Sequence, residues 1–157
     1  MKRLPLLFLA LAAMFTGCSK DSETVKPTDN AGLLKAKQWT ITSFIVKEGN
    51  DPEENVYSSL DACFKDNVYK FQTNSKFVYE EGATRCDSGD PQTLEGNWVL
   101  TNGDKNLTYT AYNLASGEAD VVSNGTIEEL TADKLVVSET QTEDGVTTKL
   151  RITYAGK

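Results

Sequence analysis

Apolar and polar side chains alternate along most of this chain, in short runs separated by turn sequences. Tyr69 and Phe71 share one parity before a Thr-Asn-Ser turn at 73–75, and Phe77 and Tyr79 share one parity after it. A period of two, with aromatic residues on both sides of a short polar turn, predicts a tight β-hairpin. The other strands can be laid out on either side of this hairpin.

The same alternation predicts eight strands in all. They cover residues 39–47, 67–73, 76–80, 94–101, 106–112, 120–130, 135–140 and 146–154. The helical segments indicated are short turns near residues 33–38 and 58–63. Strands joined in order by short turns favour an all-β fold, an eight-stranded up-and-down antiparallel barrel, because closure removes the exposed edges of the sheet. A two-sheet β-sandwich is the alternative arrangement.

Some positions carry local expectations. The first strand is apolar on both parities, with Trp39 and Ile45 on one face and Phe44 on the other. Gly96 leaves space in its strand, which indicates a close backbone approach or a bend. Gly125 interrupts the sixth strand and is expected to mark a bulge.

The N-terminal segment is typical of a targeting sequence. A basic Met-Lys-Arg start precedes an apolar run over residues 4–15, too short for a spanning helix, which needs ~20 residues. The run ends in Thr-Gly-Cys at Cys18, which resembles the lipobox of bacterial lipoproteins. That resemblance implies that the Cys18 thiol accepts a diacylglyceryl group. An ordinary signal peptide with a chance cysteine is the alternative.

These features divide the chain into a signal peptide at 1–17, a flexible tether at 18–32 and a barrel domain at 33–157. The tether is polar, and Ser19 stands where an inner-membrane retention signal would have an aspartate. Acidic residues soon after it loosely resemble the surface-export signal of Bacteroidota lipoproteins, although an ordinary solvated linker explains them equally. We expect an outer-membrane lipoprotein of the cell envelope, either periplasmic or surface-exposed.

Cysteine usage supports export. The chain has three cysteines, and an odd number in an exported protein needs an explanation. Lipidation of Cys18 leaves Cys63 and Cys86, which bracket the aromatic hairpin. A disulfide between them would close a loop of about 23 residues and stabilise the fold by roughly 3 kcal/mol. Two free, buried thiols are the alternative.

Charge and composition argue against several functions. The formal net charge is −7, and no basic patch is present, so binding to nucleic acid or electrostatic docking on anionic lipid is not expected. The chain has no histidine, which removes the commonest general base and metal ligand. No phosphate-binding or dinucleotide motif is found. The acidic loop at 51–54 lacks the ligand spacing of a calcium site. We therefore expect neither catalysis nor a metal or cofactor.

Six aromatic residues on the predicted strands are candidates for the interior of the barrel. They are Phe71, Phe77, Tyr79, Trp98, Tyr109 and Tyr154. They could line a ligand cavity, where tyrosine hydroxyls would orient a ligand. They could equally form a packed core, since a domain of this size needs such burial to be stable.

A set of dispersed positions resembles the lipocalin-like domains of Bacteroidota lipoproteins. The resemblance covers roughly residues 33–154. The matching positions are Leu33-Leu34 ahead of Trp39; Asp61, Cys63, Asp66 and Asn67; Phe71 to Phe77; Cys86; Gly96 to Leu100; and Leu130 with Leu135. It implies a lipocalin-like barrel with Cys63 joined to Cys86. Classical lipocalins carry Gly-x-Trp in the first strand, whereas Lys37 occupies that glycine position here, so a hydrophobic ligand follows only by analogy of fold.

The leading hypothesis is a non-enzymatic, monomeric envelope lipoprotein that binds a small hydrophobic or amphipathic ligand in its barrel. It would contact the membrane through the lipid on Cys18. One alternative is a structural module with a filled barrel that docks on other envelope proteins. Another is a surface inhibitor of foreign enzymes.

Overall fold

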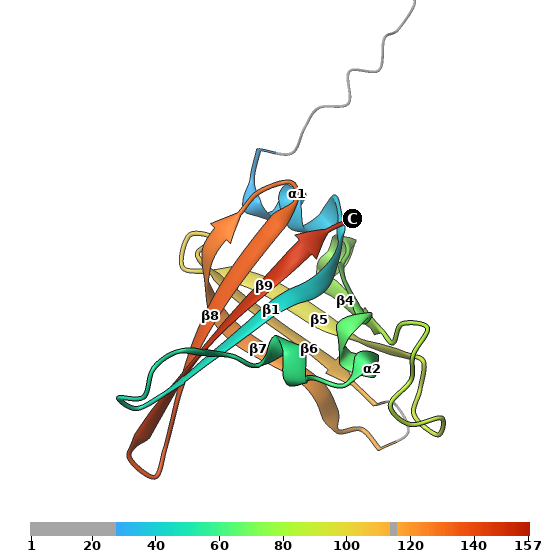
Figure 1. The fold of residues 1–157 in the computed structure, drawn as a ribbon. Coiled ribbons are helices and arrows are strands. Elements are labelled where there is room, and N and C mark those ends of the chain that lie inside the picture. The colour runs from blue at the N-terminus through green and yellow to red at the C-terminus, as the bar shows by residue number, and fades with distance from the viewer. Residues whose placement is uncertain (1–27, 114–115) are drawn as a thin grey trace, which may run out of the picture.

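The protein is an antiparallel β-barrel in a computed structural model, which describes residues 28–113 and 116–157 (Figure 1). The barrel strands are β1 (Gln38–Glu48), β3 (Val68–Phe71), β4 (Lys76–Glu80), β5 (Thr93–Thr101), β6 (Asn106–Tyr112), β7 (Ala119–Leu130), β8 (Lys134–Glu143) and β9 (Val146–Gly156). Each pairs with the next in chain order, and β9 returns to pair with β1 from Trp39 to Glu48. The eight-stranded up-and-down barrel predicted from the alternation is confirmed.

The sequence alternation assigned the inward and outward side chains of the first strand, β1, wrongly. The pairing of β1 with β9 shifts register between Ile41 and Ser43, which leaves one extra residue in β1. A bulge of this kind reverses the parity of every side chain after it. Phe44 therefore joins Trp39 inside the barrel, and Ile45, expected to share a face with Trp39, lies outside opposite Arg151. The bulge explains why the strand is apolar on both parities.

One end of the barrel is closed by the helix α1 (Asn30–Lys35). The Asp29 side chain accepts a hydrogen bond from the backbone N–H of Gly32 and caps the helix. Leu34 is fully buried, and its carbonyl accepts a hydrogen bond of 2.9 Å from the Trp39 indole N–H. The helix begins three residues before the expected domain start at 33, so the folded part already includes Asn30. The signal peptide and most of the tether lie outside the described residues.

The connection from β1 to β3 crosses the other end of the barrel. It contains β2 (Glu54–Asn55), which adds to the edge of β1, the 3₁₀ turn η1 (Val56–Ser59) and the helix α2 (Ala62–Lys65). β1 pairs with β3 only at Gln38 and Trp39, so this connection covers the gap between the two strands further along. A second 3₁₀ turn, η2 (Thr73–Ser75), links β3 to β4 at the predicted hairpin turn.

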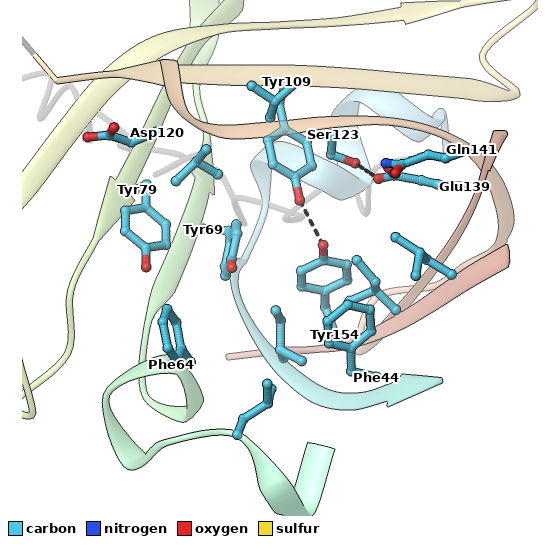
Figure 2. Close-up of a pocket in the computed structure, with 16 residues that line it drawn as sticks. Phe44, Phe64, Tyr69, Tyr79, Tyr109, Asp120, Ser123, Glu139, Gln141 and Tyr154 are labelled. Atoms are coloured by element: carbon cyan, nitrogen blue, oxygen red, sulfur yellow. Dashed lines mark hydrogen bonds between the residues drawn. The ribbon is translucent and has the colours of Figure 1, made fainter. Parts of the chain in front are cut away.

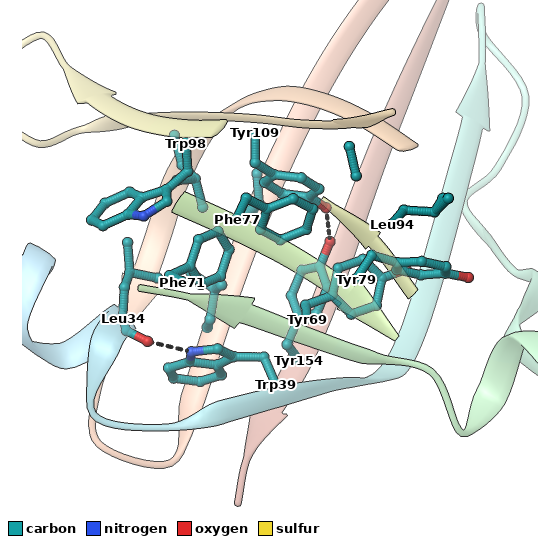
Figure 3. Packing of buried hydrophobic residues seen from close by; sticks show 14 residues of the cluster. Leu34, Trp39, Tyr69, Phe71, Phe77, Tyr79, Leu94, Trp98, Tyr109 and Tyr154 are labelled. Carbon is teal, nitrogen blue, oxygen red and sulfur yellow. Dashed lines mark hydrogen bonds between the residues drawn. The ribbon is translucent and has the colours of Figure 1, made fainter. Parts of the chain in front are cut away.

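The interior near α1 is solidly packed. Phe71, Phe77 and Trp98 pack together there, as Figure 3 shows. The Phe71 ring is tilted against Phe77 and meets Trp98 edge to face, with ring centroids 5.4 and 5.6 Å apart. The Trp98 indole N–H donates a hydrogen bond of 2.9 Å to the Gln72 carbonyl. The eight barrel strands lie within the described residues, and the pairing of β9 with β1 closes the barrel.

Two glycines allow backbones to approach closely. A Cβ on Gly96 would lie 1.8 Å from the Thr110 carbonyl oxygen of the neighbouring strand, so the predicted close approach is confirmed. The expectation of a bulge at Gly125 is wrong, because Gly125 pairs regularly with Leu107. A Cβ there would meet the Val137 side chain at 2.4 Å, so this glycine leaves room inside the barrel. Among the described residues, no helix has the length and apolar character to cross a membrane.

Candidate ligand-binding pocket

The interior is hollow in the half of the barrel away from α1. A pocket of about 410 Å³ opens there toward η1 and α2 (Figure 2). Its lining comes from β1, β3, β4, β6, β7, β8, β9 and the β1–β3 connection. The lining residues are Ile41, Phe44, Leu60, Phe64, Tyr69, Tyr79, Tyr109, Asp120, Val121, Val122, Ser123, Glu139, Gln141, Leu150, Ile152 and Tyr154.

One wall of the pocket is apolar and is set by the β1 bulge. Ile41 pairs with Tyr154, and after the register shift Phe44 pairs with Ile152. Without the extra residue, the hydroxyl side chain of Ser43 would take the interior position that Phe44 holds. Leu150, two residues before Ile152, lies on the same face of β9 and also lines the pocket. The bulge therefore supplies a continuous hydrophobic wall.

Ordered polar groups adjoin this wall, since Glu139 pairs directly with Leu150 and Tyr154 pairs with Ile41. The hydroxyls of Tyr109 and Tyr154 are hydrogen-bonded at 2.7 Å, and the Ser123 hydroxyl donates to the Glu139 carboxylate. Burial raises the pKa of Tyr109 to about 12, although its hydrogen bonds with Tyr154 and Ser123 act in the opposite direction. Burial also raises the pKa of Tyr154 well above its ordinary value. Both phenols are therefore neutral hydrogen-bonding groups at physiological pH.

The Tyr69 hydroxyl, in the pocket wall, has no hydrogen-bond partner among the described residues. Its side chain is 8% exposed, and its ring makes edge contacts with Tyr79, Tyr109 and Tyr154 at 5.3 to 6.1 Å. Burial raises its pKa well above the ordinary value. The hydroxyl oxygen is not among the buried unpartnered atoms of the described residues, so it is accessible to a molecule in the pocket.

The rim near β4 is held by the buried Asn67. Its side-chain amide donates to the Tyr79 hydroxyl, and its carbonyl oxygen accepts a hydrogen bond of 3.1 Å from the Gly82 N–H. Burial, followed by the negative charges of Glu81 and Asp66, raises the pKa of Tyr79 to about 12. Asn67 thus fixes both a pocket residue and the start of the loop after β4.

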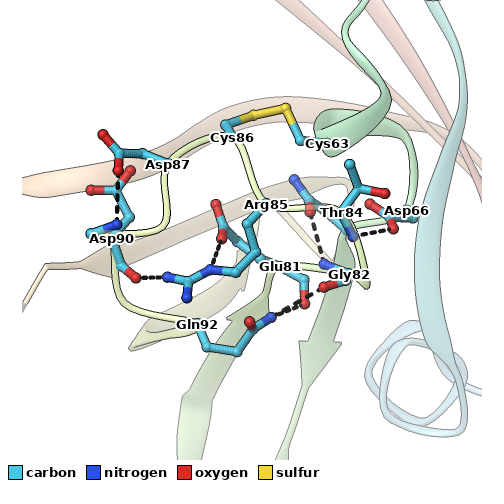
Figure 4. A network of polar contacts seen from close by, with 12 residues as sticks. Cys63, Asp66, Glu81, Gly82, Thr84, Arg85, Cys86, Asp87, Asp90 and Gln92 are labelled. Carbon is cyan, nitrogen blue, oxygen red and sulfur yellow. Dashed lines mark hydrogen bonds and ion pairs between the residues drawn. A yellow bond between two sulfur atoms is a disulfide. The ribbon is translucent and has the colours of Figure 1, made fainter.

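That loop is tied to α2 by the predicted disulfide, which is present between Cys63 and Cys86 (Figure 4). The Cα atoms of the two cysteines are 5.2 Å apart. Arg85, beside the disulfide, forms an ion pair of 3.1 Å with Glu81. The next residue after Cys63 is Phe64, which lines the pocket while 48% exposed. The disulfide therefore positions an aromatic side chain at the pocket mouth.

The six aromatic residues expected in the interior divide between the two halves of the barrel. Phe71, Phe77 and Trp98 lie in the packed half, and Tyr79, Tyr109 and Tyr154 line the pocket. The first three side chains thus belong to a packed core, and the last three border a cavity. Cys18 lies outside the described residues.

Several pocket residues were not identified from the sequence. Tyr69 shares its parity with Phe71, so the alternation could have included it. Glu139 comes after Leu135 and Val137 on the inward-facing side of β8. A carboxylate at the next inward position after two apolar residues indicates that part of the interior is polar. Leu60 and Phe64 come from the β1–β3 connection, where no periodicity marks a residue as inward-facing.

The described residues place hydrogen-bonding groups beside apolar side chains in the pocket. No group of three or more carboxylates or cysteines within residues 28–113 and 116–157 is arranged to hold a metal ion. The pocket offers an apolar wall, tyrosine hydroxyls and carboxylates. Such a combination can enclose an apolar body and orient a polar group by hydrogen bonds.

Comparison with known proteins agrees with this architecture. The family model described as Lipocalin-like domain matches residues 36–137. The match runs from the end of α1 through the middle of β8 and covers most of the barrel. No curated protein matches the chain. The chain therefore belongs to the lipocalin-like domain family.

Proposed function

We propose that this barrel binds a small hydrophobic or amphipathic molecule in the pocket and does so without catalysis. The observation that carries the proposal is the hollow half of the barrel with the unpartnered Tyr69 hydroxyl in its wall. A domain that needed its interior only for stability would gain by filling it, since voids weaken packing. The volume of about 410 Å³ falls within the usual range for small-molecule sites.

The packed half gives the pocket a rigid base. The pocket tyrosines stand on β3, β4, β6 and β9, which continue into the aromatic core near α1. The disulfide and Asn67 hold the rim. A site fixed in this way loses little conformational entropy on binding, which favours affinity.

A fluorescent probe tests this proposal. The neutral dye N-phenyl-1-naphthylamine should brighten on binding to the protein in a saturable way. Val121→Trp, which places an indole in the pocket, should abolish the signal. Val99→Trp makes the same substitution on the outer face of β5, where Val99 is 48% exposed, and should leave the signal unchanged. Equal binding by both variants would show that the dye binds elsewhere, and the pocket would lose its support.

We further propose that Cys18 is lipidated and anchors the barrel to the outer membrane of the cell envelope. The Thr-Gly-Cys sequence at the end of the apolar run supports this assignment. So does the Cys63–Cys86 disulfide, which leaves Cys18 as the cysteine without a disulfide partner in this chain and fits an oxidising compartment. Protease treatment of intact cells distinguishes a periplasmic barrel from a surface-exposed one. A barrel cleaved only after the outer membrane is permeabilised is periplasmic, and one cleaved on intact cells is surface-exposed.

A further inference from the structure

The charge of the pocket is unusual for a site expected to hold a hydrophobic molecule. We infer that the pocket prefers an amphipathic organic cation, an amine or ammonium group on an apolar body, over a neutral or anionic amphipath. The inference rests on the proposed function and names the chemical class of its ligand. Its basis is a carboxylate placed beside the tyrosines, with no cation lining the same space.

Glu139 is the residue that would bind the cationic group. It is half-buried on the inward parity of β8 and lines the pocket. One carboxylate oxygen accepts a hydrogen bond from Ser123, which orients the group. The other oxygen has no hydrogen-bond partner among residues 28–113 and 116–157. A half-buried carboxylate attracts a partner of opposite charge more strongly than an exposed one, because screening is weaker there.

The aromatic rings and the rim add to the same preference. Tyr69, Tyr79 and Phe44 line the same pocket as Glu139, as Figure 2 shows. Ring faces attract ammonium groups through their quadrupole. Asp120, exposed at the mouth, adds a second negative charge along the entry path.

The lysines and arginines near the site do not line the pocket. Lys149 and Arg151 alternate with Leu150 along β9 and therefore lie on the outer face. Arg151 forms an ion pair of 2.9 Å with Glu53. Arg85 near the rim is paired with Glu81. Lys65, beside Phe64 on α2, donates a hydrogen bond to the Ser58 carbonyl. Among the described residues, no basic side chain lines the pocket.

The electrostatic consequence distinguishes three kinds of amphipath. An ammonium head group gains a charge-assisted hydrogen bond with Glu139. A hydroxyl head group can also donate to this carboxylate, but it lacks the added attraction between opposite charges. A carboxylate head group meets a like charge at short range in a poorly screened site, so we expect it to bind weakest.

Titration calorimetry with three octyl compounds tests this order at pH 7. The probes are octylammonium, 1-octanol and octanoate, which share one apolar chain. The protein begins at Ser19 and is secreted so that its disulfide forms, since the whole barrel lies within the described residues. We expect octylammonium to bind at least about tenfold more tightly than 1-octanol. Octanoate should bind more weakly than both.

Two matched variants assign the preference to Glu139. Glu139→Gln keeps the shape and the hydrogen bond with Ser123, so it should lower the affinity for octylammonium about tenfold and leave 1-octanol unchanged. Glu128→Gln removes the same charge from the exposed outer side of β7. It should leave all three affinities unchanged.

The outcomes separate this inference from the proposed function. If 1-octanol or octanoate binds as tightly as octylammonium, the preference for a cation is wrong while the pocket remains a ligand site. If both glutamate variants lower the affinity for octylammonium equally, net charge rather than Glu139 is responsible, and the assignment is overturned. If none of the three probes binds and N-phenyl-1-naphthylamine also fails to bind, the proposed function itself is wrong.

Discussion

At the scale of single residues, Gly96 is the described glycine at which an added Cβ would come closest to a neighbouring atom. Gly96→Ala would force a Cβ to within 1.8 Å of the Thr110 carbonyl oxygen, which belongs to backbone and cannot rotate away. We expect the free energy of unfolding in urea to fall by about 2 kcal/mol or more. The control is Gly89→Ala, whose Cβ would meet only the flexible Asp87 side chain at 3.3 Å. A loss at Gly96 no larger than that at Gly89 would contradict the strand pairing described.

The buried tyrosines predict a loss of stability in alkali. The pKa of Tyr109 is raised to about 12, so the folded state favours the neutral phenol. This contribution is fully present below the unfolded pKa of about 10 and is lost as the pH rises through the folded pKa. By pH 11 we expect the contribution of Tyr109 to the free energy of unfolding to have fallen by about 1.4 kcal/mol. Urea unfolding at pH 8 and pH 11 measures the difference.

The matched variant for that measurement is Tyr109→Phe, which cannot ionise at this position. Its stability should fall between pH 8 and pH 11 by about 1.4 kcal/mol less than that of the unmodified protein. Tyr112→Phe alters a tyrosine that is 38% exposed and serves as the control. If the stability of Tyr109→Phe depends on pH as that of the unmodified protein does, ionisation of Tyr109 is not the cause of the loss of stability in alkali.

At the scale of elements, the disulfide connects stability to the pocket mouth. Replacing both Cys63 and Cys86 by serine removes the covalent bond between two positions that are 23 residues apart in the sequence. This change should lower the free energy of unfolding by about 3 kcal/mol. Because α2 carries Phe64, the double variant should also bind N-phenyl-1-naphthylamine several-fold more weakly. Alkylation without reductant that labels both cysteines in the unmodified protein would contradict the disulfide.

The elements also show what the sequence could and could not predict. The strands were predictable because alternation marks a sheet with one buried face, and the turns at 73–75, 102–104 and 143–145 separate the runs. The β1 bulge could not be read from residue types, since apolar side chains on both parities fit a strand buried on both faces equally well. Gly125 resembles a bulge in sequence but instead makes room for Val137.

At the scale of the whole molecule, the barrel has one filled half and one hollow half. The six aromatic residues chosen from the sequence fall in both, because periodicity tells which side of a strand is inward but not how far along the barrel axis the packing continues. The polar group next to the apolar wall had one sequence signal, Glu139 on an inward parity. The contribution of the β1–β3 connection depends on where the chain crosses the barrel mouth, which only the three-dimensional arrangement gives.

The anchoring proposal makes a separate prediction for the whole chain. Cells that express the unmodified protein and are fed radiolabelled palmitate should incorporate label into it, and it should partition into the detergent phase of Triton X-114. Cys18→Ala should abolish both properties, because the thiol that accepts the lipid is gone. An unmodified protein that stays in the aqueous phase with a free Cys18 thiol would show that the segment is an ordinary signal peptide.

The central claim is that the hollow half of the barrel is a ligand site, and native mass spectrometry tests it most directly. The protein would be secreted, purified without detergent and measured beside Val121→Trp, in which the pocket is filled. We predict a discrete added mass on the unmodified protein, either carried through purification or taken up from a panel of alkyl amines and alcohols, and no such mass on the variant. A clean unliganded mass for both proteins with every compound of the panel would contradict the claim.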